Sequence, residues 1–173
     1  MIRYIKKAIP LSVLATSIIA SAALADSFTL RVGSGHPAKA TAYVGNMEKV
    51  LVPNIKKRVA AETNHKVRII EAYAGKIAKV HETLEAVEKG LLDIGSYCVC
   101  FETAKLLPWN FDYFVPFTTS NLITSVAVKN KIIKKFPYLT KMLEDKYNQK
   151  FIALQGFDDY GLGTVKQYFG LDS

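Results

Sequence analysis

Alternating hydrophobic and polar positions predict two strands in the first half of the chain. The alternation covers residues 27–33 and 65–73, where every second residue is apolar or aromatic over most of the stretch. Two apolar runs without this alternation, at 91–100 and 150–157, predict further strands. The sequence between these runs has a different period.

Apolar residues recur at three- and four-residue steps in residues 44–59 and 77–90, which predicts a helix in each. Thr41 is a suitable N-cap for the first helix, and Pro53 inside it predicts a kink or break near residues 51 and 52. Gly90 stands where the second helix would take its C-cap.

The second half is less regular. Residues 106–121 are aromatic and interrupted by proline, which predicts a loop or short helix that packs over the sheet edge. Residues 122–135 show a weak helical pattern, and Pro137 can occupy the first turn of another helix over 137–149. The order strand, helix, strand, helix, strand predicts an α/β fold with a parallel sheet.

The first 25 residues differ from the rest. Arg3, Lys6 and Lys7 precede an apolar run, and residues 23–25, ALA, fit a signal-peptide cleavage site before Asp26. A membrane anchor is the alternative, but the run is shorter than the ~20 residues that a span needs. We therefore expect an exported protein.

Removing this leader lowers the formal net charge from +8 to about +5. Such an excess suits nucleic acid, an acidic membrane or small anions, and export argues against nucleic acid. The lysines are scattered along the chain, so solvated helix faces explain most of them. At 173 residues with 50% apolar content, one domain is the expectation.

Cys98 and Cys100 form a C-x-C pair. In a strand, the Cα atoms of such a pair lie near the upper limit of disulfide geometry, which favours structural thiols over a disulfide. A metal site needs more ligands, and the three histidines show no matching spacing.

Candidate ligand-binding residues follow from the predicted topology. In a parallel α/β sheet, ligands bind beyond the carboxyl ends of the strands. The residues at those positions are His36 after the first strand, Glu71 and Tyr73 at the end of the second, and Ser96 and Tyr97 at the third. Each also has an ordinary structural role open to it, in a turn, an ion pair or the core.

Signals for catalysis are weak. Ser34 and His36 place a hydroxyl near an imidazole, but no third group that would orient the imidazole is identifiable. The stretch GSGHPA lacks the glycine spacing of a dinucleotide site and the lysine of a phosphate-binding loop.

Several stretches resemble one family in order and spacing. They are FTLRVGSGHP, KVRIIEAYAGKI, HETLEAVEKGLLDIGSY and LPWNFDYFVPFTTSN, the most specific being Glu82 to Gly95, with Pro116-Phe117 in support. Together they resemble the start of the periplasmic solute-binding proteins of TRAP (tripartite ATP-independent periplasmic) transporters. The resemblance covers nearly the whole chain after residue 25, except its last ten residues.

The resemblance implies a two-lobed, doubly wound periplasmic-binding-protein-like receptor. Such a receptor closes on an organic acid anion, needs no cofactor and delivers its ligand to membrane permease subunits. On this reading residues 1–25 are the signal peptide, 26–150 the first lobe, and 151–173 the crossing strand with the truncated start of a second lobe. Family members are roughly twice as long, and an arginine of the second lobe pairs with the ligand carboxylate.

This sequence departs from that pattern, because its last arginine is Arg68. We therefore expect a first-lobe sheet with an unpaired edge and a binding-impaired, non-enzymatic protein of the periplasm. Two alternatives stay open: an exported single-domain enzyme that uses His36 with Ser34 or Cys98 with Cys100, and a truncated reading frame without function.

Overall fold

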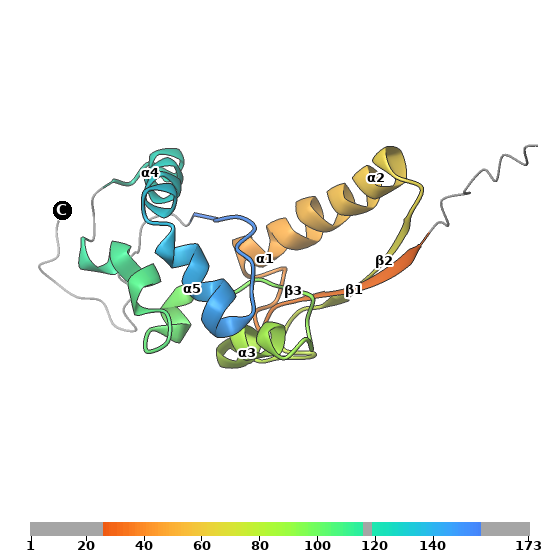
Figure 1. Cartoon of the computed structure of the whole chain (residues 1–173), viewed down its shortest axis with the longest axis horizontal. Helices are drawn as coiled ribbons and strands as arrows, with labels where there is room; N and C mark the ends of the chain where they lie inside the picture. Colours follow the sequence, from red (N-terminus) through yellow and green to blue (C-terminus); the bar gives the residue numbers. More distant parts are fainter. Residues whose placement is uncertain (1–25, 116–118, 157–173) are drawn as a thin grey trace, which may run out of the picture.

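The computed structural model describes residues 26–115 and 119–156 and has a mixed α/β fold (Figure 1). The predicted leader, the Pro116-Phe117 pair and residues 157–173 of the predicted crossing and second-lobe segment 151–173 lie outside the described residues. Within the described residues, no helix combines the length and the apolar character needed to cross a bilayer.

Three parallel strands form the sheet. They are β1 (Ser27–Gly33), β2 (Lys66–Ala72) and β3 (Ile94–Gly95), in the order β2-β1-β3. β1 and β2 pair along their whole length, from Ser27 opposite Lys66 to Gly33 opposite Ala72. The predicted parallel α/β arrangement and the positions of the first two strands are therefore confirmed.

The third strand is much shorter than predicted. It ends at Gly95, and the chain then turns into the 3-10 helix η3 (Val99–Glu102). This turn brings the Cα atoms of Cys98 and Cys100 to 5.2 Å, and the two residues form a disulfide. The prediction of free thiols was wrong because it assumed a strand, where the two residues would be farther apart.

The first predicted helix forms as α1 (Ala42–Asn46), a π-helical turn η1 (Met47–Leu51) and α2 (Val52–Glu62). Thr41 is its N-cap by position, although its side chain makes no capping hydrogen bond. Pro53 has no N–H for the usual bond four residues back, and the π turn just before it absorbs this defect. The local distortion is thus where it was predicted.

The second predicted helix is also short, comprising the 3-10 turn η2 (Val80–Glu82) and α3 (Thr83–Glu88). The chain reaches it through a turn at Ala74 and Gly75, both with positive φ, so Ile77 lies outside the helix and is exposed. Gly90 follows α3 with φ of +67°, as expected for its predicted capping role.

The second half is helical. It contains the 3-10 helix η4 (Leu107–Phe114), α4 (Leu122–Lys135) and α5 (Tyr138–Tyr147). α4 begins at Asn121, whose side chain accepts a hydrogen bond from the Thr124 N–H at 2.9 Å. Both helices match their predictions, but residues 150–156 form no strand, because no described strand pairs with them.

Hydrophobic residues gather in separate clusters on the two sides of the molecule. In residues 26–96, the sheet region, one cluster lies under α1 and η1 and a smaller one lies under α3. In residues 97–156, the helical region, Trp109 packs with residues of α4 and α5. Residues 106–111 therefore pack mainly in the helical region, whereas the prediction for 106–121 was packing over the sheet edge.

Candidate functional site

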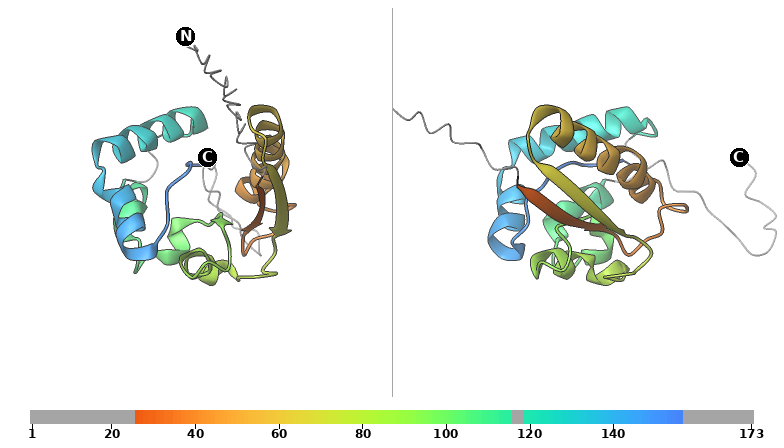
Figure 2. Two further views of the ribbon diagram at one scale, coloured as in Figure 1. Left: turned by 45° about the vertical axis from the view of Figure 1, so that its right-hand side comes forward. Right: turned by 90° about the vertical axis from the view of Figure 1, so that its right-hand side faces the viewer.

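A cleft of about 1840 Å³ lies between the sheet region and the helical region. One wall comes from one face of α1, η1 and α2, and a second from residues 92–99, which include β3. The opposite wall comes from η4, α4 and residues 148–155. In the left view of Figure 2 these helices lie across from the sheet, and residues 151–156 run between the helices and the sheet.

Ser96 and Tyr97 line this cleft, in agreement with their predicted positions at the end of the third strand. The Ser96 N–H continues the pairing of β3 with β1, since it donates to the Gly33 carbonyl at 3.0 Å. The Tyr97 hydroxyl donates to the Gln149 side chain at 3.0 Å. Burial raises the pKa of Tyr97, as do the nearby Glu102 and Glu85 carboxylates, so its hydroxyl remains a donor at neutral pH.

His36 does not line the cleft but contacts a residue that does. Its Nδ1 is 2.5 Å from the hydroxyl of Tyr43, which does line the cleft, and its ring also packs against Phe101. Burial raises the pKa of the Tyr43 hydroxyl. His36 can therefore position Tyr43, and the structure does not place it on the cleft surface.

Glu71 and Tyr73 do not line the cleft either. Glu71 belongs to β2, the edge strand on the other side of β1 from β3, and Tyr73 follows the end of that strand. The Tyr73 hydroxyl donates to the Glu71 carboxylate at 3.0 Å. Tyr73 is buried in the cluster under α1. Burial and the Glu71 carboxylate raise its pKa. The strand-end rule thus brings only two of the five predicted residues to the cleft.

Two glutamines and an asparagine that the sequence analysis did not select also line it. The Gln149 side chain donates to the Leu84 carbonyl at 2.8 Å. The Gln155 side chain donates to the Tyr43 carbonyl at 3.0 Å and accepts from Asn46 at 3.2 Å. Asn46 shares the helix face of Tyr43, but no signal in the sequence links the glutamines to residues so distant along the chain.

Positive charge in the cleft is limited. Of the basic residues in the described chain, Lys129 and Lys150 line it, and Lys129 forms an ion pair with Asp112. Lys150 is exposed. Arg31 and Arg58 pair elsewhere, with Asp93 and Glu62. An anion in the cleft would therefore meet one lysine without a carboxylate partner among the described residues.

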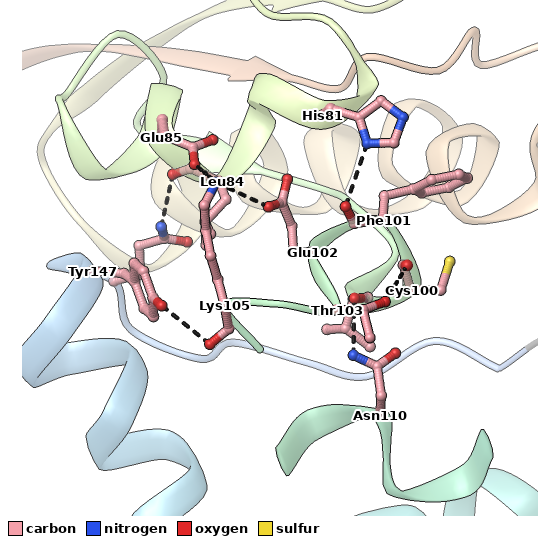
Figure 3. A network of polar contacts seen from close by, with 12 residues as sticks. His81, Leu84, Glu85, Cys100, Phe101, Glu102, Thr103, Lys105, Asn110 and Tyr147 are labelled. Carbon is pink, nitrogen blue, oxygen red and sulfur yellow. Dashed lines mark hydrogen bonds and ion pairs between the residues drawn. The ribbon is translucent and has the colours of Figure 1, made fainter. Parts of the chain in front are cut away.

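A polar network beside the cleft ties the helical region to α3 (Figure 3). Lys105 forms ion pairs with Glu85 on α3 and with Glu102, a buried carboxylate, and its carbonyl accepts a hydrogen bond from the Tyr147 hydroxyl at 3.1 Å. The disulfide residue Cys100 accepts from the Thr103 hydroxyl at 2.8 Å. This network fixes the chain on both sides of η3.

The arrangement around Ser34 does not favour a nucleophile. Ser34 is 1% exposed, and its hydroxyl accepts the backbone N–H of His36 at 3.2 Å. The His36 ring contacts Tyr43 and Phe101. Among the described residues, no set of three or more His, Cys, Asp or Glu side chains is placed to hold a metal ion.

Comparison of the chain with protein-family models, with curated proteins and with solved structures returned no match.

Proposed function

We propose that the chain forms the first lobe of a periplasmic solute-binding protein of the TRAP type, a binding protein rather than an enzyme. It would capture an organic acid anion for membrane permease subunits. The doubly wound, periplasmic-binding-protein-like type of fold is part of this proposal. The proposal builds on the resemblance of the sequence to this family, which is most specific from Glu82 to Gly95.

The cleft is the observation that carries the proposal. It lies against the end of β3, where parallel α/β folds bind their ligands, and it combines apolar walls with a few hydrogen-bonding groups. Ser96 offers a hydroxyl and Tyr97 a neutral phenol there. The disulfide between Cys98 and Cys100 beside them suits an oxidising compartment such as the periplasm.

We expect weak binding, because no arginine lines the cleft among the residues that the structure describes. A carboxylate would be held by Lys150 and by neutral donors, without the bidentate pair that an arginine provides. A single exposed ion pair contributes only about 0–1 kcal/mol. Affinity of millimolar order for a matching acid is the expected result.

Titration calorimetry and the fluorescence of Trp109 can test this against a panel of C4 dicarboxylic, branched and aromatic acids. Each acid is paired with its neutral amide. One class of acid should bind saturably while its amide does not, and Lys150→Gln should weaken binding about two- to fivefold. Lys146→Gln is the matched control, since Lys146 is exposed on α5 and does not line the cleft.

Two outcomes would count against the proposal in different ways. If no acid in the panel binds, or if amides bind as well as acids, the assignment to organic anions fails. Binding at micromolar affinity or tighter would retain the function and overturn the expectation that this chain is binding-impaired.

A further inference from the structure

The disulfide between Cys98 and Cys100 has no part in capturing an anion. Its two cysteines are two positions apart, so the bond joins no segments that are distant along the chain. In the chain-entropy account, a disulfide stabilises a fold by closing a loop in the unfolded chain, and it stabilises less as that loop becomes shorter. A purely structural role therefore accounts poorly for this bond.

Other contacts already hold the turn that carries the disulfide. The Val99 carbonyl accepts a hydrogen bond from the Asn110 side chain at 3.0 Å. The Nδ1 atom of His81 lies 3.3 Å from the carbonyl oxygen of Phe101. Glu102, the last residue of η3, belongs to the polar network of Figure 3. We therefore expect η3 to keep its place when the S–S bond is opened.

The two cysteines have different surroundings. Cys98 is only 9% exposed and lines the cleft. Cys100 is half-buried, and Figure 3 shows its sulfur directed away from Lys105 and the carboxylates around it. Cys100 lines a separate cavity of about 170 Å³, whose other lining residues carry no charge: Thr103, Leu107, Asn110, Tyr113 and Phe114. A small reagent in this cavity meets Cys100 rather than Cys98.

The backbone of η3 also distinguishes the two sulfur atoms. The Cys100 N–H donates a hydrogen bond to the Cys98 sulfur at 3.4 Å. A hydrogen-bond donor stabilises a thiolate more than a neutral sulfur, because the thiolate carries a full negative charge. Exchange is faster when the departing sulfur is the better-stabilised thiolate. The turn therefore favours Cys98 as the leaving group and Cys100 as the sulfur that is attacked.

We propose that this disulfide is a site of thiol–disulfide exchange with a dithiol, and that the attack takes place at Cys100. A thiolate of the dithiol forms a bond to the Cys100 sulfur, the S–S bond breaks, and Cys98 leaves as a thiolate that takes up a proton. The second thiol of the reagent loses its proton and attacks the reagent sulfur of the mixed disulfide. Cys100 is then released and protonated in turn.

The reaction is balanced by the dithiol itself. The protein gains two electrons and two protons, and the dithiol loses the same number and becomes a disulfide. The inference goes beyond the proposed function, because it requires no organic acid and no change in the cleft.

Dithiothreitol provides the probe. The full chain is incubated with it under native conditions and in enough urea to unfold the chain, and free thiols are counted by alkylation with iodoacetamide and mass spectrometry. We expect the rate constant of native reduction to lie within about threefold of the unfolded value, because access governs exchange. Far-ultraviolet circular dichroism of the native sample should stay unchanged as the thiols appear.

Charges placed beside Cys100 test the route of attack. Leu107 lines the cavity of Cys100 and is 50% exposed. Because the attacking group is an anion, Leu107→Asp should slow native reduction about threefold or more, and Leu107→Lys should speed it by a similar factor. Both effects should shrink as salt is added. Leu91→Asp is the matched control, since Leu91 is 51% exposed and lines neither cavity.

A monothiol locates the attacked sulfur. Brief treatment with β-mercaptoethanol in the presence of iodoacetamide gives a mixed disulfide on one cysteine and an alkyl group on the other. Fragmentation of the peptide then assigns each group. We expect the mixed disulfide on Cys100 and the alkyl group on Cys98 in about tenfold excess or more over the reverse.

Each contrary result overturns the proposal. Native reduction about tenfold or more slower than in urea would make the bond a protected structural disulfide. Equal changes in rate for Leu107→Asp and Leu107→Lys would show disturbed packing rather than an anion passing through the cavity. A mixed disulfide found mainly on Cys98 would reverse the roles of the two sulfur atoms.

Discussion

The sheet region is held together by backbone pairing, whereas the helical region is held by side-chain packing. β1 and β2 pair through seven successive residues, and helices cover the sheet on both sides. In the helical region, Trp109, Ile133, Leu139 and Leu143 pack without any described strand, and the Trp109 indole donates to the Leu139 carbonyl at 3.1 Å. The two regions therefore depend on different residues for their stability.

The contacts between the regions are concentrated at α3. Leu84 belongs to α3 but is buried in the cluster of the helical region, and its carbonyl accepts from Gln149. Lys105 pairs with Glu85 on the same helix. Away from α3 the regions also touch through Gln155 at Tyr43 and Asn46 and through Phe101 at His36, but these are single contacts. We therefore expect residues at α3 to have the largest effect on whether the two regions unfold together.

Leu84→Ala tests this dependence most strongly. Leu84 is 0% exposed, and the loss of its side chain leaves a cavity at the contact between the regions. We expect the free energy of unfolding to fall by about 2–5 kcal/mol. Urea unfolding should then lose the coincidence of Trp109 fluorescence, which reports on the helical region, and far-ultraviolet circular dichroism.

Leu91→Ala is the control for this variant, since Leu91 follows α3 but is 51% exposed. Its effect should stay within about 0.5–1 kcal/mol. Equal destabilisation by both variants, with coincident transitions, would contradict the view that Leu84 couples the two regions.

Gln149→Met should have the next largest effect. The substitution keeps most of the side-chain volume but leaves the Leu84 carbonyl without its donor and the Tyr97 hydroxyl without its acceptor. A buried group left unpaired costs about 1–3 kcal/mol, so we expect a loss in that range by urea unfolding.

A double-mutant cycle with Tyr97→Phe separates the two bonds. Because the Tyr97 hydroxyl donates to the Gln149 amide, the Gln149→Met and Tyr97→Phe effects should not add. Lys146→Met serves as the surface control on α5. Additive effects within error would show that Tyr97 and Gln149 act independently.

The contrast between local sequence signals and contacts distant along the chain explains which elements could be predicted from the sequence. β1, β2 and α4 were located to within a residue or two, because alternation, helical period and the Asn121 cap are local signals. Residues 150–156 failed as a strand because a strand needs a partner, and pairing is not a local property. The disulfide was missed because the turn after Gly95 shortens the Cα separation of its cysteines.

The residues of the candidate site also divide into those placed by a general rule and those placed by contacts distant along the chain. The position of Ser96 and Tyr97 beside the cleft could be predicted because the strand-end rule depends only on topology. Glu71 and Tyr73 obey the same rule but lie at the far edge strand, and the strand order β2-β1-β3 is not visible in the pattern. Gln149 reaches Leu84 from 65 residues away, and no periodicity predicts such a contact.

Gly90→Ala tests a local feature of the sheet region. Gly90 has φ of +67°, but no atom lies within 4 Å of where a Cβ would be added. The cost therefore comes from the backbone alone, and we expect about 1 kcal/mol in urea unfolding. Gly90→Asn should cost less, because asparagine tolerates the left-handed region better. A cost for asparagine equal to that for alanine would contradict this origin.

The pair of Arg31 and Asp93 gives the smallest effect, and it is the one that depends on pH. Asp93 accepts two side-chain hydrogen bonds from Arg31, each at 3.0 Å, and one from the Arg31 N–H at 2.7 Å, which fixes the chain just before β3 against β1. The side-chain hydrogen bond from Arg31 holds the pKa of Asp93 below its ordinary value, against a smaller opposing effect of burial.

A carboxyl group whose pKa is lower in the folded than in the unfolded state stabilises the fold when it is ionised. This stabilisation is fully present at pH values above the unfolded-state pKa of about 3.9, and it is lost as the pH falls through the folded-state pKa. Asp93→Asn should therefore lower the urea midpoint slightly at pH 7, with a difference from the parent that shrinks below about pH 4. Glu62→Gln removes the exposed Arg58 pair within α2, away from β3, and is the control. A difference for Asp93→Asn that persists undiminished at pH 2 would mean that the Asp93 side chain stabilises the chain before β3 by hydrogen bonding and packing rather than by its charge.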